Sequence, residues 1–437
     1  MTQTLSLPEG LAARTIQRRR DFHRFPELGL TEFRTASAIA STLQALGLEV
    51  QAGHDVMEAR SRVGVPPEDQ VAAAFARARE EGADPSWLAR FEGGYTGVVG
   101  TLRGAHPGPA IALRCDIDAL PILESDEREH VPAREGFVSQ HRGVMHACGH
   151  DVHAAIGLGV AEALAARREQ LHGTVKFLFQ PAEEGGRGAI PMRDAGVVDD
   201  VDYFIAIHAG MDSESGVFYP ITIGWLVSAK LDVTFTGKSA HAGGRPNEGR
   251  NALLAAAHAV VGLYGIARHH AGRSRVNVGV LQAGSGRNVI ADRAFFMMEV
   301  RGETEEICDY MLARADSVIR GAAQAQEVGV DIVPVGRTTS AESSRSLAEA
   351  VARAASSVPN LRTTLEPKEA GGSEDATFLM RRVQERGGLA IYACVGSHTP
   401  SGHHTPRFDV AESDIVPAVQ ALATAIAAVG ENPPLSS

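Results

Sequence analysis

The sequence predicts an α/β fold in which a smaller, ferredoxin-like domain is inserted into a larger domain with a mostly parallel sheet. Short apolar strands alternate with helical segments up to residue 226 and again after residue 338, as in parallel sheets covered by helices. Between them, residues 227–337 follow the βαββαβ order of ferredoxin-like domains. Because 437 residues exceed one ordinary hydrophobic core, we expect a larger domain from residues 1–226 and 338–437 and an inserted domain at 227–337.

The elements of the larger domain are predicted from hydrophobic periodicity and turn signals. Residues 15–46 have helical periodicity that breaks at 25–27. Residues 55–92 form a charged, proline-containing insertion, expected on the surface or over a cleft, with one helix near 71–81. The other expected elements are strands at 97–102, 110–115, 175–179, 203–207 and 388–395 and helices at 154–166, 345–356 and 413–429.

The elements of the inserted domain follow from the same signals. Its expected strands and helices, in chain order, are strand 230–236, helix 252–266, strand 276–281, strand 295–301, helix 304–326 and strand 330–335.

Composition narrows the class of protein. With 44% apolar and 22% charged residues the chain has the make-up of a globular protein in water. A net charge of -11 without a long basic run argues against nucleic-acid binding. No apolar stretch is expected to reach membrane-spanning length, and the N-terminus lacks a signal-peptide pattern, so we expect a cytoplasmic protein. Four scattered cysteines do not suggest a disulfide framework, and all except Cys148 are expected to be buried apolar residues.

Met-His-Ala-Cys-Gly-His-Asp at residues 145–151, followed by His153, is the stretch richest in possible metal ligands. Cys148 and His150 are separated by one glycine, so both side chains can turn toward one point at a bend. Thiolate and neutral imidazole are ligands that zinc, manganese, nickel or cobalt accept. His146 and His153 can equally support these ligands or be ordinary loop residues.

Other candidate ligands follow the ends of predicted strands, where open parallel sheets place their clefts. They are Arg114, Asp116, Asp118, Glu183, Glu184, His208 and His404. Adjacent carboxylates such as Glu183 and Glu184 disfavour joint ionisation unless a cation compensates. One of them can bind a metal while the other takes a proton from a water that the metal activates, although most Glu-Glu pairs are merely solvated.

Single residues in this set have alternative interpretations. His208 alone could be structural, and only one of His403 and His404 is expected to face a metal. Asp116 and Asp118 alternate on an extended segment and so share a face. They could hold a ligand histidine or face the metals directly.

Four motifs together resemble the co-catalytic metallopeptidase family, which includes glutamate carboxypeptidases, aminoacylases and indole-3-acetyl-amino-acid hydrolases. These are Cys-Asp-Ile-Asp-Ala-Leu-Pro at 115–121, the 145–151 motif, Gln-Pro-Ala-Glu-Glu-Gly at 180–185 and His-Thr-Pro-Arg-Phe-Asp at 404–409. They occur in order along nearly the whole chain. The 55–92 insertion and the Gly-Gly-Ser-Glu-Asp-Ala-Thr block at 371–377 resemble the subgroup that hydrolyses p-aminobenzoyl-glutamate and indole-3-acetyl-aspartate.

The resemblance implies roles for individual residues. Two divalent metal ions, Mn²⁺ or Zn²⁺, would be bound by Cys148, His150, Glu184, His208 and His404. Glu183 matches the general base, and His241 matches a histidine that the inserted lid and dimerisation domain offers to the substrate carbonyl, often across a dimer interface. Asn288 is assigned with Asp116 and Asp118 to substrate binding. Arg114 stands where the peptidase branch has the histidine of His-x-Asp, which removes one expected ligand.

The implied activity is metal-dependent hydrolysis of the amide between an aromatic acyl group and an acidic amino acid. p-Aminobenzoyl-glutamate is the first expectation and indole-3-acetyl-aspartate the second, with a general N-acyl-amino-acid hydrolase as a third. A different alternative is an inactive partner subunit of a hetero-oligomer. The expected partners are a small N-acyl amino acid and a second copy of the chain, or a homologous second subunit, with no nucleic acid and no membrane.

Overall fold

The computed structural model describes residues 4–435, which separate into two compact units. Among the described residues, unit 1 comprises 4–223, 341–370 and 375–435, and unit 2 comprises 224–340 and 371–374. The chain thus leaves unit 1 at Gly224, returns at Ala341 and enters unit 2 again at Gly371–Glu374. That residues 227–337 fold as an independent domain stays a prediction.

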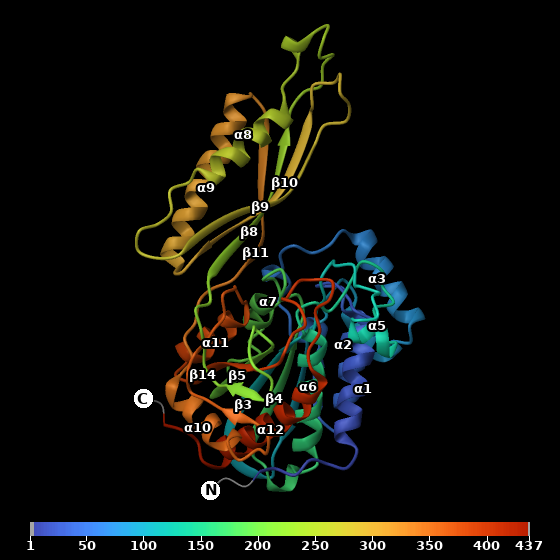
Figure 1. The fold of residues 1–437 in the computed structure, drawn as a ribbon, viewed down its shortest axis with the longest axis vertical. Coiled ribbons are helices and arrows are strands. Elements are labelled where there is room, and N and C mark those ends of the chain that lie inside the picture. Colours follow the sequence, from blue (N-terminus) through green and yellow to red (C-terminus); the bar gives the residue numbers. More distant parts are fainter. Residues whose placement is uncertain (1–3, 436–437) are drawn as a thin grey trace. The chain divides into compact units, whose positions relative to one another are not determined.

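A mixed sheet of eight strands runs through unit 1 (Figure 1). Its spatial order is β1 (Glu49–Ala52), β2 (Val98–Arg103), β4 (His172–Gln180), β3 (His106–Asp116), β5 (Tyr203–Ala209), β14 (Leu389–Val395), β6 (Val217–Tyr219) and β12 (Arg362–Thr363). The four central strands, β4, β3, β5 and β14, are parallel to one another. This confirms the predicted α/β class with a mostly parallel sheet.

The register of the central strands brings several candidate residues to one edge. Asp116 pairs with Gln180 across β3 and β4, and His208 pairs with Cys394 across β5 and β14. Because these strands are parallel, their carboxyl ends share an edge of the sheet. One expectation needs correction: Asp116 and His208 do not follow their strands. Asp116 is the last residue of β3, and His208 is the second-last residue of β5.

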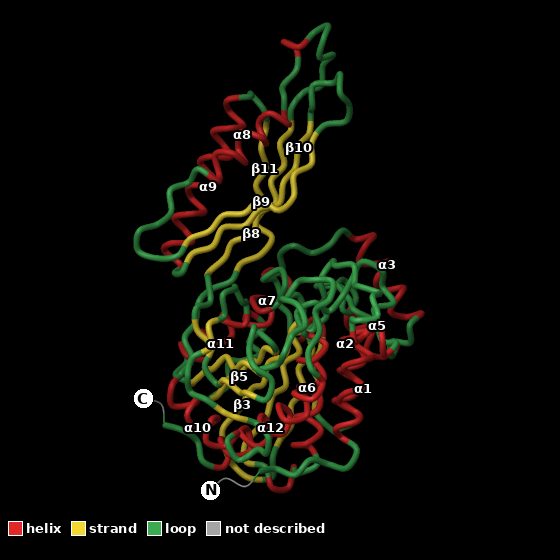
Figure 2. Tube along the Cα trace, viewed as in Figure 1, coloured by secondary structure: helices red, strands yellow, loops and turns green. Residues whose placement is uncertain are grey.

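Helices cover the sheet of unit 1 (Figure 2). α6 (His150–Ala165) and α12 (Ile415–Glu431) contact β3 and β4, and α1 (Leu11–Arg24) packs on α6. α6 starts at His150, four residues earlier than predicted, so the motif histidine occupies the first turn of a helix. Every residue from His150 to Leu164 is buried, as expected for a helix that is apolar on all sides.

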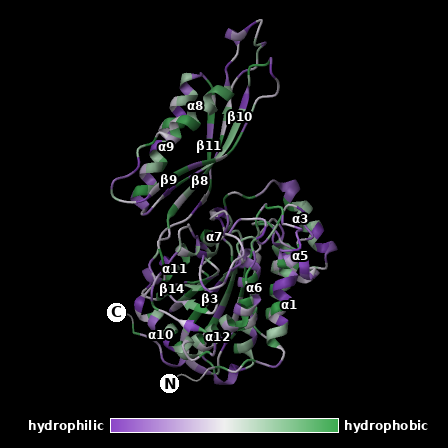
Figure 3. Ribbon diagram, in the orientation of Figure 1, coloured by the Kyte–Doolittle hydropathy of each residue, from purple (hydrophilic) through white to green (hydrophobic). Residues whose placement is uncertain are grey.

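One helical stretch, Glu412–Glu431, is long and apolar enough to cross a membrane by length and composition. This corrects the expectation that no segment reaches that length. Within the fold 67% of its most apolar window is buried, which is typical of a core helix. Surface helices contrast with it, as the hydrophilic colour of α3 (Glu68–Glu80) illustrates (Figure 3).

The insertion at 55–92 packs on the outer part of unit 1. It contains α3, where a helix was predicted, and the short α4 (Pro85–Leu88). Phe75 on α3 meets Phe33 on α2 (Phe33–Ala45) edge to face, with ring centroids 5.3 Å apart. Phe91 is fully buried and belongs to the core of unit 1.

Unit 2 is a four-stranded antiparallel sheet with two helices on one face (Figure 1). In spatial order the strands are β11 (Gly329–Arg337), β8 (Val227–Thr236), β10 (Arg293–Gly302) and β9 (Ser274–Ala283), and the helices are α8 (Ala252–Tyr264) and α9 (Glu305–Ala325). Asn251 and Thr304 cap the helices, since each side chain accepts a backbone N–H from the first turn. The predicted βαββαβ order is confirmed.

The remaining elements are short or lie at the edge of unit 1. They are α5 (Val131–Glu135), α7 (Ala189–Asp194), α10 (Arg345–Ala355), α11 (Ala376–Glu385), β7 (Thr222–Ile223) and β13 (Lys368–Glu369). Of these only α10 was predicted, because the others have too few residues for a clear period or, in α11, follow a glycine-rich block.

Candidate metal centre

Cys148 and His150 converge because the chain turns at Gly149. Gly149 has a φ of 87°, a left-handed conformation that is unfavourable for residues with a Cβ. Cys148 precedes this turn and His150 opens α6 directly after it. Together with His208 near the end of β5, they form a buried group whose candidate ligand atoms lie within 4.8 Å of one another.

The hydrogen bonds of His150 and His208 leave one nitrogen of each ring for a metal. Nδ1 of His150 donates to Oδ1 of Asp118 at 3.2 Å, and Nδ1 of His208 donates to the carbonyl of Ala209 at 2.8 Å. Nε2 of His208 lies 3.5 Å from Sγ of Cys148. Nε2 of His150 is buried and has no hydrogen-bond partner among the described residues. A buried nitrogen in this condition is costly unless something else binds it.

Negative charge surrounds that nitrogen. Oε2 of Glu183 and Oε1 of Glu184 each lie 3.9 Å from Nε2 of His150, and Oδ2 of Asp116 lies 3.8 Å away. Burial opposes a charge on His150, but Asp116 and Asp118 outweigh it and raise the pKa of the ring well above its ordinary value. The same carboxylates would stabilise a metal cation.

A second group of candidate ligands shares Cys148. It consists of Cys148, Glu184 and His404, and Nε2 of His404 lies 3.4 Å from Oε1 of Glu184. The backbone N–H of His404 donates to the carbonyl of Ala147 at 2.8 Å, which ties the two motifs together. Burial raises the pKa of Cys148 well above its ordinary value, so its thiolate requires a compensating cation. Thiolate, imidazole and carboxylate are ligands that divalent metal ions accept, so the chemistry of the two groups fits such ions.

Three buried carboxylates hold the loop that carries Glu183 and Glu184. Asp118 accepts the N–H groups of both glutamates, each at 3.0 Å. Glu32 accepts the N–H of Ala182 at 2.8 Å, where the backbone is left-handed with a φ of 52°. Asp375 accepts the N–H groups that follow the loop, of Gly188 at 3.1 Å and Ala189 at 3.0 Å. The carboxylates of the pair are thus presented by a loop fixed at both ends.

Arg114 is engaged by buried acceptors at the edge of the sheet of unit 1. It is fully buried, and NH1 donates to Oδ2 of Asp116 at 2.7 Å. Nε donates to Oε1 of Gln180 at 2.8 Å, and NH2 lies 3.3 Å from Oδ1 of Asp375. His153 donates from Nδ1 to the other oxygen of Asp116. Burial opposes ionisation of Asp116, but His150, Arg114 and His153 hold its pKa well below the ordinary value.

These contacts show what Asp116 and Asp118 touch in unit 1. Both are buried, and their partners are Arg114, His153, His150 and the backbone of the glutamate loop. Asp118 accepts from Nδ1 of His150, as the first of the two possibilities requires, but that His150 is a metal ligand stays a prediction. That either residue binds substrate stays a prediction.

His153 and His146, the other two histidines in and after the 145–151 motif, have different surroundings. Nε2 of His153 accepts the N–H of Ala209 at 2.8 Å, so that ring orients Asp116 and has no free lone pair for a metal. His146 is buried, and burial lowers its pKa to about 3, so it is neutral.

His241 and Asn288 lie together in unit 2. The backbone N–H of Ala242 donates to the carbonyl of Asn288 at 3.0 Å, and both His241 and Asn288 are exposed. Nδ1 of His241 accepts the N–H groups of Gly243 and Gly244, at 3.1 and 3.0 Å. The proton of a neutral ring is therefore on Nε2, which makes His241 an available hydrogen-bond donor.

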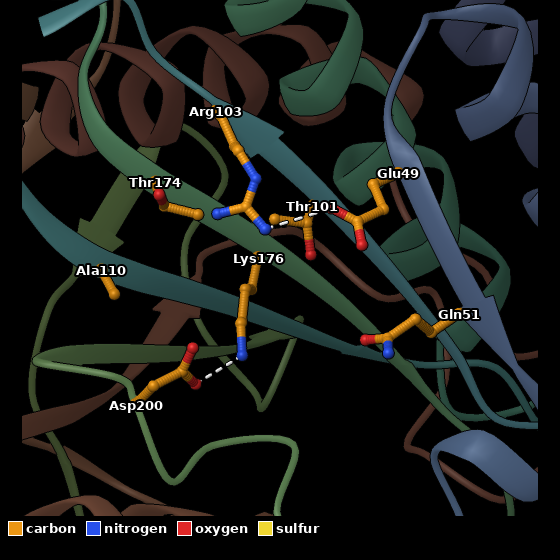
Figure 4. A pocket seen from close by; sticks show the side chains of 8 residues that line it. All are labelled: Glu49, Gln51, Thr101, Arg103, Ala110, Thr174, Lys176 and Asp200. Carbon is orange, nitrogen blue, oxygen red and sulfur yellow. Dashed lines mark hydrogen bonds and ion pairs between the residues drawn. The ribbon is translucent and has the colours of Figure 1, made fainter.

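A polar hollow of about 230 Å³ lies on the sheet of unit 1, away from these residues (Figure 4). Its cations are already paired within the hollow: Arg103 with Glu49 at 3.1 Å and Lys176 with Asp200 at 2.5 Å. Because each cation has an acidic neighbour, the hollow is a solvated sheet surface with little attraction for a charged ligand.

Sequence reasoning missed three residues of the centre: Glu32, Gln180 as a partner of Arg114, and Asp375. Glu32 lies in the first helical region, about 150 residues from the loop it holds, and no local pattern connects the two. Asp375 lies in the glycine-rich block at 371–377, and that block was the only available signal.

Comparison with known proteins agrees with this geometry. The family model for peptidase family M20/M25/M40 matches residues 112–428. The chain is 48% identical over 408 residues to an indole-3-acetyl-aspartic acid hydrolase of Enterobacter agglomerans, covering 93% of this chain and 94% of the relative. It is 46% identical over 414 residues to a p-aminobenzoyl-glutamate hydrolase subunit of Escherichia coli (strain K12), covering 94% and 95%.

Solved structures agree as well. An aminobenzoyl-glutamate utilization protein from Klebsiella pneumoniae superposes with a TM-score of 0.80 at 43% identity, covering 97% of each chain. A dinuclear metal-binding peptidase of the M20 family from Bacillus subtilis superposes with a TM-score of 0.66 at 25% identity, covering 97% and 99%. The predicted resemblance is confirmed: the chain is a metal-dependent amide hydrolase and belongs to peptidase family M20/M25/M40.

Proposed function

We propose that this protein hydrolyses the amide bond between an aromatic acyl group and an acidic amino acid, with p-aminobenzoyl-glutamate as the first substrate to test. The 46–48% identity to hydrolases of p-aminobenzoyl-glutamate and indole-3-acetyl-aspartate, over more than nine tenths of the chain, supports this substrate class. Indole-3-acetyl-aspartate is the second candidate, and a general N-acyl amino acid the third.

The proposed metal ligands are Cys148, His150, Glu184, His208 and His404 for two divalent ions, Mn²⁺ or Zn²⁺. When bound, these ions would acidify a water and polarise the substrate carbonyl. The observation that carries the assignment is the buried Nε2 of His150, which lacks a hydrogen-bond partner in the described part of the chain and lies among three carboxylates. A buried ring nitrogen among carboxylates requires a metal cation or a proton as its partner.

Glu183 is the proposed general base. Its backbone is fixed by Asp118, and its Oε2 lies near His150, so the carboxylate faces the region where it would meet the attacking water. Glu183 would take the proton from water and deliver it to the leaving amine. From unit 2, the Nε2–H of His241 would donate to the carbonyl oxygen as negative charge develops there. Asn288, beside His241, would bind the substrate carboxylate or the same oxygen.

The test measures release of free amino acid by chelated enzyme reloaded separately with Mn²⁺ or Zn²⁺. The substrates are p-aminobenzoyl-glutamate, indole-3-acetyl-aspartate and an N-acetyl amino acid. Metal-dependent turnover of an aromatic conjugate above the acetyl compound is the expected result. Glu183→Ala should abolish turnover while metal content stays at the wild-type level. Near-normal kcat in that variant would contradict the role of Glu183.

Self-association through unit 2 is also proposed, with residues 227–337 as the lid and dimerisation domain. β9 is an edge strand, and α8 next to it exposes Leu254, Val261 and Tyr264, the second at 75%. Tyr264 joins the two elements, since its hydroxyl donates to Oδ1 of Asn277 at 3.0 Å. An apolar helix face beside an open strand edge favours pairing with a second copy.

The alternative is that this chain is one half of a hetero-oligomer, because one relative is named as a subunit of its hydrolase. Light scattering of the purified chain distinguishes the two: a dimer with full activity supports the homodimer. Metal-loaded protein without activity until a homologous chain is added would instead support the hetero-oligomer.

The predicted cytoplasmic location is part of this proposal and is tested by fractionating cells.

A further inference from the structure

His403 lies beside Cys148 in unit 1, yet its hydrogen bonds differ from those of the proposed ligands. Nε2 of His403 lies 3.0 Å from the backbone nitrogen of Met211, whose N–H donates to it. A ring nitrogen that accepts a hydrogen bond carries no proton, so the proton of the neutral ring is on Nδ1. Nδ1 lies 3.5 Å from Sγ of Cys148.

The surroundings of the ring fix this arrangement. Gly210 and Met211 both have left-handed backbones, with φ of 84° and 55°, which turn the N–H of Met211 toward the ring. A Cβ at Gly210 would lie 3.1 Å from Nε2 of His403. Phe408 packs on the ring with centroids 4.6 Å apart. Nε2 is thus occupied by the backbone, and Nδ1 faces the sulfur as a donor.

We propose that His403 is a positioning residue that donates a hydrogen bond from Nδ1 to the metal-binding thiolate of Cys148 and is not itself a metal ligand. The inference rests on the proposed metal centre. A hydrogen bond to sulfur withdraws electron density from the thiolate and fixes its direction, so His403 tunes how strongly Cys148 donates to the metals. His403 thus donates a hydrogen bond to a proposed metal ligand, whereas His404 is itself a proposed metal ligand.

Cobalt(II) reports on this bond directly, because a cobalt-bound thiolate gives a sulfur-to-metal charge-transfer band. His403→Gln keeps an oxygen near the position of Nε2 that can accept from Met211, but loses the donor near Nδ1. His403→Asn is the matched control, since its amide nitrogen lies near the position of Nδ1 and retains the donor. We expect the band to move to lower energy in the Gln variant, together with a roughly 10- to 100-fold loss of cobalt affinity. In the Asn variant both should stay close to wild type.

The outcomes separate the inference from the proposed function. An unchanged band in His403→Gln would overturn this inference alone and leave the metal centre intact. Cobalt-loaded wild-type protein without such a band would overturn both the ligand role of Cys148 and this inference. Circular dichroism checks that each variant is folded. If His403→Gln does not fold, Gly210→Ala, whose Cβ would lie 3.1 Å from Nε2 and displace the ring, should shift the band, and an unshifted band there would overturn the inference.

Discussion

Asp118→Asn is the substitution that most directly tests how unit 1 positions its ligands. The wild-type carboxylate accepts from Nδ1 of His150 and from the backbone N–H groups of Glu183 and Glu184. Asparagine has the same shape but replaces one acceptor oxygen by an NH₂ group. In its least costly orientation Oδ1 stays toward His150 and Glu183, and the NH₂ group faces the N–H of Glu184.

The expected cost follows from these three bonds. A buried N–H left without an acceptor costs about 1–3 kcal/mol, and each of the two remaining bonds loses about 1 kcal/mol with the charge. The resulting total is about 3–5 kcal/mol. Part of it should appear as weaker metal binding, because loss of a histidine's supporting carboxylate typically lowers metal affinity roughly 10- to 100-fold, or by about 1.4–2.8 kcal/mol. We expect the remainder as a lower free energy of unfolding.

The assay is metal titration by calorimetry, combined with urea unfolding of the metal-free protein and steady-state kinetics. Asp414→Asn is the control, since Asp414 is also buried. It accepts hydrogen bonds from the hydroxyl of Ser215 and, at 3.0 Å, from the N–H of Gly216, and neither residue is a proposed metal ligand. It should lower stability without changing metal affinity. Wild-type metal affinity in Asp118→Asn with a raised KM would refute the positioning role and favour the predicted contact of Asp118 with substrate.

Three further outcomes are expected. Cys148→Ser should weaken metal binding at both sites, because Cys148 belongs to both ligand groups, and unchanged metal content at equal purity would exclude it as a ligand. Arg114→Met should destabilise unit 1 by about 3–5 kcal/mol in urea unfolding, since it removes the guanidinium that pairs with buried Asp116 and Asp375; a change below about 1 kcal/mol would contradict this. Burial opposes the charge on His23, but hydrogen bonds to Asp151 and Glu124, each at 2.8 Å, raise its pKa to about 9. This contribution, about 3 kcal/mol, is complete below the unfolded pKa near 6.5 and is lost as pH rises through about 9, so His23→Gln should flatten the alkaline limb of the stability profile.

The sequence by itself determined the architecture and the chemical type of the site. Periodicity of 2 and 3.6 residues revealed most of the longer strands and helices of both units, because each of these repeats its apolar face over many residues. The spacing of Cys148 and His150 across Gly149 predicted a ligand pair, since one left-handed glycine suffices to direct both side chains. These features are local, and so they can be recognised without the fold.

Only the tertiary structure decided what each histidine does and what holds the glutamate loop. His153 and His403 each accept a backbone N–H from the end of β5 and the segment after it, at Ala209 and Met211, and this fixes which ring nitrogen carries the proton. Glu32 and Asp375 reach the loop from segments about 150 and 190 residues away. Tautomer and ligand role depend on partners distant in the chain, and no spacing in the sequence encodes such contacts.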